Sequence, residues 1–152
     1  MLQTFKLEAD MEMVRGNVIG LNSLWNNITS SFVSAFQTDH LKMKVFFDPS
    51  LALPGFHIFF GHEAFVREGG LWHMDMGHIQ LGLPDIDPIS FTVTVCLPKD
   101  GGGLNYKQDD KENYLAYEVG GMVLHDGCMM HKIASLNSYQ EDDERITMQG
   151  HG

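Results

Sequence analysis

Hydrophobic residues in the first quarter of the chain recur with helical spacing. After Asp10 they follow one another at intervals of three or four residues, at Val14, Val18, Leu21, Trp25, Ile28 and Phe32. This spacing places them on one face of a helix of about seven turns. Asp10 is a suitable N-cap for that helix. The pattern therefore predicts a long amphipathic helix over about 10–36.

From residue 43 onward the pattern changes to short segments that suit strands. In 90–97, apolar residues alternate with threonine or cysteine, the period of two expected for a strand with one buried face. Turn sequences such as KDGGGL and EVGG separate further predicted strands, at 43–47, 56–60, 71–81, 103–106, 114–118, 121–125, 129–134 and 145–149. One helix followed by strands, without β–α–β alternation, predicts a mainly β single domain over 1–152. We expect a sandwich or barrel over about 43–150 with the helix packed outside.

Composition and charge narrow the functional classes. A length of 152 residues suits one domain. The chain lacks both the roughly 20 apolar residues of a membrane span and a basic-then-apolar leader. Two cysteines give no disulfide framework, so we expect a cytoplasmic protein. A net charge of −10 argues against nucleic acid as a partner.

Among the eight histidines, His73 is distinguished by its spacing from Asp75. In a strand, residues two apart point to the same face, so this imidazole and carboxylate converge. An unpaired aspartate inside a barrel is costly, and a bound metal would remove that cost. His78 has the opposite parity and is expected to lie behind the site or at the surface.

The third metal ligand should come from a distant strand, and the segment GGMVLHDGCMMHKIAS offers His125 and His131. We favour His131 because its strand runs on towards Arg145. Two histidines and one carboxylate with open positions are typical of non-haem Fe(II) oxygenases. Arg145 and Thr147 share a strand face, and a guanidinium beside a hydroxyl suits a carboxylate ligand.

The motifs HMD, GGGLNY, MMHKIA and RIT, in this order within about 56–150, resemble those of the Fe(II)/2-oxoglutarate-dependent dioxygenases. The resemblance implies a double-stranded β-helix, a jelly-roll barrel of cupin-like architecture. It implies that His73, Asp75 and His131 bind Fe(II), and that Arg145 and Thr147 hold 2-oxoglutarate. It also implies hydroxylation of a small-molecule or peptide substrate by molecular oxygen, with release of succinate and CO2. Halogenating members lack the carboxylate corresponding to Asp75, so its presence favours hydroxylation.

Substrate contacts are expected from loops around 61–72, 76–89 and 105–113, with Trp72, Asn105 and Tyr106 as candidates. The chain is short for this family, which suggests a minimal or truncated member. Two alternatives stay open: a cupin-type metal protein without 2-oxoglutarate chemistry, and a non-catalytic barrel that serves as a binding module. The cupin pattern of His-x-His followed by glutamate is not seen. A structural zinc site is disfavoured because Cys96 and Cys128 are widely spaced.

Overall fold

The computed structural model describes residues 2–6, 55–83 and 86–151. The helix predicted over 10–36 and the strand predicted at 43–47 lie outside these residues. The described part is mainly β, as the sequence pattern predicts, and its strands pair in antiparallel fashion.

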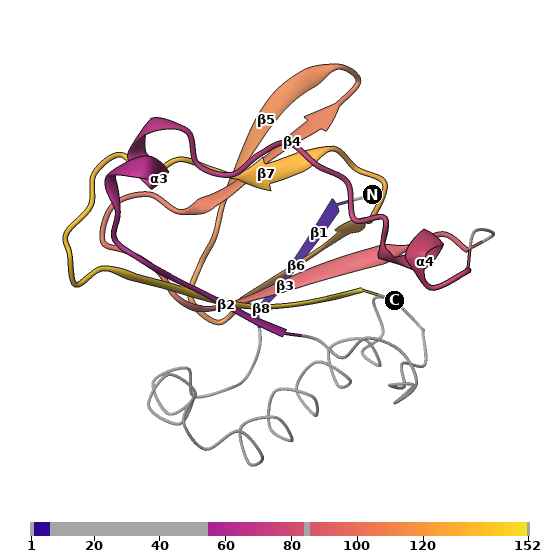
Figure 1. Cartoon of the computed structure of the whole chain (residues 1–152), viewed down its shortest axis with the longest axis horizontal. Coiled ribbons are helices and arrows are strands. Elements are labelled where there is room, and N and C mark those ends of the chain that lie inside the picture. The colour runs from indigo at the N-terminus through magenta and orange to yellow at the C-terminus, as the bar shows by residue number, and fades with distance from the viewer. Residues whose placement is uncertain (1, 7–54, 84–85, 152) are drawn as a thin grey trace, which may run out of the picture.

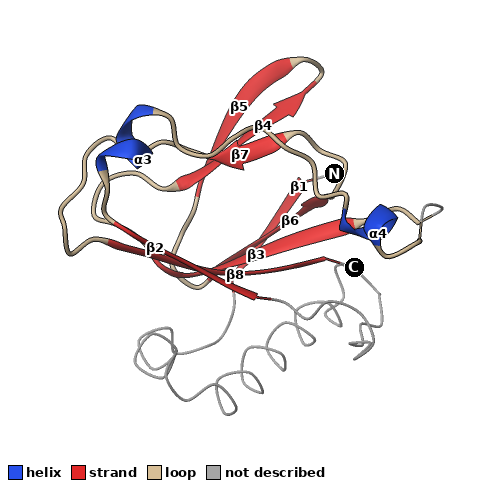
Figure 2. Ribbon diagram, in the orientation of Figure 1, coloured by secondary structure: helices blue, strands red, loops and turns tan. Residues whose placement is uncertain are grey.

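The described strands form two sheets that face each other as a β-sandwich of the jelly-roll kind (Figure 1). The larger sheet has five strands, in the order β1 (Leu2–Lys6), β6 (Gly121–Asp126), β3 (Ile89–Cys96), β8 (Glu144–His151) and β2 (Gly55–Phe60). The smaller sheet has three strands, in the order β5 (Lys111–Ala116), β4 (Gly103–Gln108) and β7 (His131–Ile133). Figure 2 shows the strands of both sheets in red and the two short helices in blue.

Both short helices differ from the sequence prediction. Helix α3 (Glu63–Arg67) begins after His62, whose side chain accepts a hydrogen bond from the Ala64 N–H at 3.1 Å. Helix α4 (Gly77–Gln80) falls inside the segment 71–81, which was predicted as one strand. That prediction was wrong: only His73 forms a β-bridge there, to His131, and the chain then turns into α4. Strand β1 was not predicted at all.

The described part of the chain contains no helix with the length and apolar character needed to cross a lipid bilayer.

The central strand β3 is buried on both faces. Its apolar residues Phe91, Val93 and Val95 are at most 4% exposed, which confirms the buried face predicted from alternation. Residues directly opposite on neighbouring strands point to the same face, and Ser90 opposes both His125 of β6 and His151 of β8. The polar residues of β3 therefore face the smaller sheet, and the space between the sheets has a polar lining.

Candidate active site

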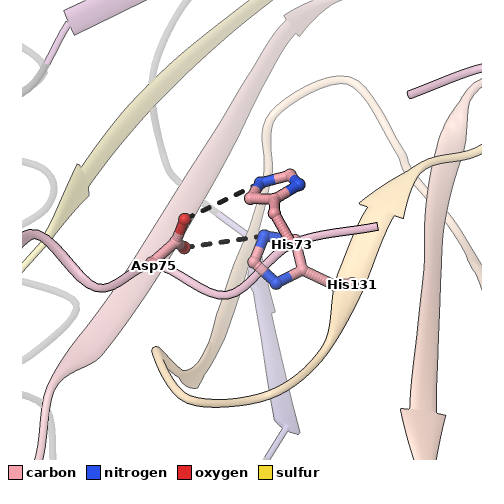
Figure 3. Close-up of side chains that lie close together, drawn as sticks. All are labelled: His73, Asp75 and His131. Atoms are coloured by element: carbon pink, nitrogen blue, oxygen red, sulfur yellow. Dashed lines mark ion pairs between the residues drawn. The ribbon is translucent and has the colours of Figure 1, made fainter. Parts of the chain in front are cut away.

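His73, Asp75 and His131 come together at the edge of the smaller sheet (Figure 3). The Nε2 atom of His73 lies 3.8 Å from Asp75 Oδ1, and that of His131 lies 3.5 Å from Asp75 Oδ2. Metal–ligand bonds of about 2.0–2.2 Å allow two ligand atoms of one ion to lie up to about 4.4 Å apart. The two histidine–carboxylate separations therefore fit a shared metal ion.

Backbone carbonyls orient both imidazoles for metal binding. Nδ1 of His73 lies 2.8 Å from the Leu71 carbonyl oxygen, and Nδ1 of His131 lies 2.8 Å from that of Met129. A carbonyl only accepts, so each Nδ1 carries the proton and donates it, which leaves the Nε2 lone pair free. Burial also lowers the pKa of His131 below its usual value of 6.5, which favours the neutral imidazole that a metal requires.

The loop that carries His73 and Asp75 is held against β7 and the turn that precedes it by main-chain hydrogen bonds. The Gly70 N–H donates to Ile133 at 2.9 Å, and the Asp75 N–H donates to Gly127 at 2.8 Å. Gly69 precedes this run with a φ of 63°, and a Cβ at that position would lie 2.6 Å from the Ile133 oxygen. The loop therefore needs glycine at residue 69 in order to approach β7 this closely.

A cavity of about 110 Å³ adjoins the candidate metal ligands, and we call it the chamber. Besides the three ligands it is lined by His57, Ser90, Phe91, Thr92, Leu104, Tyr117, His125, Ile133, Gln149 and His151. His151 Nδ1 lies 2.9 Å from Ser90 Oγ and 3.7 Å from Asp75 Oδ2. Burial lowers the pKa of both His57 and His125. The neutral imidazole is therefore favoured at both His57 and His125, beside the candidate ligands.

Arg145 lies on β8 with its guanidinium buried and unpaired. The residue is 5% exposed, and its three side-chain nitrogens make no hydrogen bond with any described residue. The guanidinium carbon lies 5.5 Å from the ring centre of Tyr117 and 5.8 Å from that of Phe59. Burial lowers the pKa of Arg145 and raises that of Tyr117. Arginine stays charged in proteins, so within residues 2–6, 55–83 and 86–151 this positive charge has no hydrogen-bonded partner.

Two threonine hydroxyl groups, one on β8 and one on the neighbouring strand β3, also lack hydrogen-bond partners within the described residues. Thr94 and Thr147 oppose one another on β3 and β8, are at most 1% exposed, and make no side-chain hydrogen bond within the described residues. Buried polar groups without partners cost stability. An anion with oxygen acceptors is the ligand class that this donor set fits, because it would accept hydrogen bonds from the guanidinium and the hydroxyls.

This donor set adjoins the chamber. His57, which lines the chamber, directly opposes Thr147 on the neighbouring strand β2. Arg145 itself borders a separate cavity of about 20 Å³, and Ile133 lines both cavities. Ile133 is therefore shared by the space near the candidate metal ligands and the space near the guanidinium.

The remaining residues singled out in the sequence lie away from the chamber or at its edge. Trp72 contacts Lys107 and Lys132, whose Nζ atoms are 4.9 and 5.0 Å from the centre of its ring. Asn105 opposes Lys132, and neither Asn105 nor the half-buried Tyr106 lines the chamber. His78 is buried in α4 at 8% exposure, outside the chamber lining.

Several lining residues were not found by sequence reasoning. Tyr117 lies just after β5, and no motif in LAYEV marks it as a neighbour of Arg145. His57 and His151 could have been found only from strand positions, because His151 lies two residues after the chamber-lining Gln149 on β8 and His57 opposes Thr147 of the same strand. That inference requires the pairing of β2 with β8, which the sequence alone does not give.

No family model matches the sequence, and no curated protein sequence matches it. Among solved structures, a prolyl-4-hydroxylase from Pseudomonas putida matches 97% of this chain and 85% of its own, with a TM-score of 0.55 and 15% identity. An N-substituted L-amino acid dioxygenase from Burkholderia ambifaria AMMD, in complex with alpha-KG, matches 95% of this chain and 69% of its own, with a TM-score of 0.49 and 13% identity. At the level of the fold, the chain therefore resembles the Pseudomonas putida prolyl-4-hydroxylase.

Proposed function

We propose that this chain is an Fe(II)- and 2-oxoglutarate-dependent oxygenase that hydroxylates a small-molecule or peptide substrate. In this proposal His73, Asp75 and His131 hold the iron, and Arg145 with Thr147 binds the far carboxylate of 2-oxoglutarate. The reaction consumes molecular oxygen and releases succinate and CO2. Two histidines and one carboxylate, with open positions beside them, are the donor set that suits this metal and chemistry.

The observation that carries the proposal is the buried guanidinium of Arg145, which has no hydrogen-bond partner in the described part of the chain. A metal-binding barrel without a keto-acid co-substrate has no need of a buried cation between two aromatic rings. A dicarboxylate ligand explains the buried cation, because one carboxylate would pair with the planar guanidinium of Arg145 while the other end of the molecule reaches the metal. The nearby unpaired Thr147 hydroxyl supplies a further donor.

The protein groups have distinct tasks in this mechanism. The iron and the keto acid, when bound, supply the oxygen activation and the two electrons that the substrate alone does not provide. Nε2 of His73, Nε2 of His131 and the Asp75 carboxylate would hold the metal at the wall of the chamber. Arg145 orients the keto acid, and the rings of Phe59 and Tyr117 exclude water from the pair, which strengthens it.

The test is an anaerobic titration of the full chain with Fe(II) and then 2-oxoglutarate. We expect the weak visible charge-transfer band of a metal-chelated keto acid, and succinate release once oxygen is admitted. Asp75→Ala should abolish the band. Asp87→Ala, at an exposed aspartate outside the chamber lining, serves as the matched control and should keep it.

Two results would contradict the proposal in different ways. Tight metal binding without any band at saturating 2-oxoglutarate would favour the cupin-type alternative. Neither metal nor keto-acid binding by a folded protein would favour a non-catalytic binding module.

A further inference from the structure

His125 lines the chamber, but the proposed metal and keto acid give its side chain no role. It lies on β6, is 3% exposed, and lines the chamber. Its ring centre is 4.5 Å from that of His131, so it lies next to a candidate metal ligand. The three residues that offer ligand atoms within 4.8 Å of one another are His73, Asp75 and His131, so His125 is not needed to complete the metal site.

The structure fixes which nitrogen of His125 carries the proton. Nδ1 lies 2.9 Å from the carbonyl oxygen of Asp126. Because a carbonyl can only accept, Nδ1 must donate, and a neutral imidazole then has a lone pair on Nε2. Nε2 makes no hydrogen bond with any residue that the structure describes, and the inward register of His125 on β6 turns it towards the chamber. The chamber therefore contains a hydrogen-bond acceptor that lacks a donor.

Neither 2-oxoglutarate nor succinate can satisfy this acceptor. At neutral pH both carboxylates of each are ionised, and a keto oxygen has no hydrogen, so both molecules offer acceptors only. Two acceptors that face each other repel. The donors that remain for Nε2 are water and a bound molecule that carries an N–H or O–H group, and a substrate that enters the chamber displaces the water.

We propose that His125 is a specificity-determining residue that accepts a hydrogen bond from the primary substrate, and that the substrate is an amine or an alcohol. This inference rests on the proposed oxygenase function, since it concerns the molecule that is oxidised beside the keto acid. A site with a buried acceptor discriminates against an analogue that lacks the donor, because the acceptor is then left unpaired. An aliphatic molecule without N–H or O–H is consequently a poor substrate.

The first experiment measures the acceptor directly, without turnover. Full-length protein labelled with ¹⁵N-histidine is loaded with Zn(II) and 2-oxoglutarate, and the His125 nitrogen signals are assigned with His125→Gln. We expect an unprotonated Nε2 whose signal shifts when propylamine or 1-propanol is added. The quaternary N,N,N-trimethylpropylammonium ion and methyl propyl ether carry no N–H or O–H and should cause no shift. A protonated Nε2 would overturn the proposal, and so would a bonded Nε2 before any amine or alcohol is added, which would identify metal-bound water as the donor.

The second experiment measures succinate release by the Fe(II) enzyme with a panel of small amines and alcohols. Each panel member is paired with its quaternary trimethylammonium analogue or its methyl ether, neither of which has an N–H or O–H. We expect stimulation by donor-bearing members at least roughly tenfold above their methylated partners. His125→Leu should lose this preference, whereas His125→Gln, which keeps an acceptor, should retain much of it.

Failure of this inference is distinguishable from failure of the proposed function. The affinities for Fe(II) and 2-oxoglutarate should be the same in the wild type and both His125 variants. Absence of the keto-acid band in the wild type contradicts the oxygenase proposal. If the keto-acid band is normal while succinate release is stimulated equally by a donor-bearing molecule and its methylated analogue, or by no amine or alcohol at all, the role of His125 is contradicted. Either result leaves the oxygenase proposal standing.

Discussion

His73 and His131, both members of the candidate metal site, are also joined through their main chains. The N–H of each donates to the carbonyl oxygen of the other at 2.9 Å, and their ring centres lie 4.4 Å apart. The spacing of the two imidazoles is thus set by backbone pairing before any metal binds. Such preorganisation reduces the ordering cost of metal binding. It also makes the site dependent on residues that hold the loop against β7.

Gly69→Ala tests that dependence. The substitution forces an L side chain into a φ of 63° and places a Cβ 2.6 Å from the Ile133 oxygen. We expect a loss of about 2–4 kcal/mol in the free energy of unfolding and a weaker affinity for Co(II). The measurement is urea unfolding, combined with a Co(II) titration of the folded protein.

Gly82→Ala is the matched control for Gly69→Ala. Gly82 has a φ of 75°, but a Cβ there meets no atom within 4 Å. It should cost only the roughly 1–2 kcal/mol of the left-handed conformation and leave the metal affinity unchanged. Equal effects of the two substitutions on Co(II) binding would show that the contact with β7 does not support the site.

Trp72→Leu separates packing from substrate recognition at a residue that the sequence suggested for substrate binding. The ammonium groups of Lys107 and Lys132 both lie within 5.0 Å of the centre of the Trp72 ring. Partly exposed cation–π contacts contribute about 0.5–1 kcal/mol each, so we expect a loss of about 1–2 kcal/mol in the free energy of unfolding. Lys107→Met should cost about half as much, and its effect should be largely absent in the Trp72→Leu background. Reduced turnover at unchanged stability would instead indicate that Trp72 contacts substrate.

Strand periodicity identified much of the sheet structure because most strands have an apolar face. The alternation in 90–97 corresponds to β3, and the buried side was assigned correctly. Periodicity could not show that the opposite face of β3 is buried as well. Ser90, Thr92 and Thr94 look like surface residues in the sequence, but they are at most 4% exposed because they face the space between the sheets.

The candidate site was predictable where it depends on spacing and was missed where it depends on pairing between strands. The two-residue spacing of His73 and Asp75 indicated convergence, and the structure places them with His131. The same reasoning extended the strand to residue 81 and missed α4, because a four-residue helix is too short for a periodic pattern. Tyr117 was missed because its contact with Arg145 joins residues 28 positions apart with no shared motif.

Ile133→Trp tests whether the keto acid must pass from the chamber to the guanidinium. Ile133 lines both the chamber and the small cavity beside Arg145. A larger side chain should fill that junction and weaken 2-oxoglutarate binding more than roughly tenfold, while Co(II) affinity stays within a factor of about two. Overpacking costs about 1–3 kcal/mol, so unfolding is measured in parallel.

Ile133→Val is the conservative control, because it keeps the shape at the β-carbon and removes one methyl group. It should bind both ligands as the wild type does. If Ile133→Trp keeps full affinity for 2-oxoglutarate, the keto acid does not occupy the space between the two cavities.

Arg145→Met should affect stability and co-substrate binding in opposite directions. In the ligand-free protein the substitution removes a buried, unpaired charge, and the thioether can still contact the rings of Phe59 and Tyr117. We therefore expect the ligand-free variant to be more stable than the wild type by about 1–3 kcal/mol. At a 2-oxoglutarate concentration of about 100 times the Kd, the free energy of unfolding of the metal-loaded wild type should rise by about 2.7 kcal/mol, and that of the variant should not change.

Arg145→Lys keeps the charge without the planar guanidinium and should bind the keto acid at least roughly tenfold more weakly than the wild type. Urea unfolding with and without 2-oxoglutarate measures all three proteins. If Arg145→Met instead destabilises the ligand-free fold strongly, the guanidinium serves the structure and is not a receptor for a carboxylate.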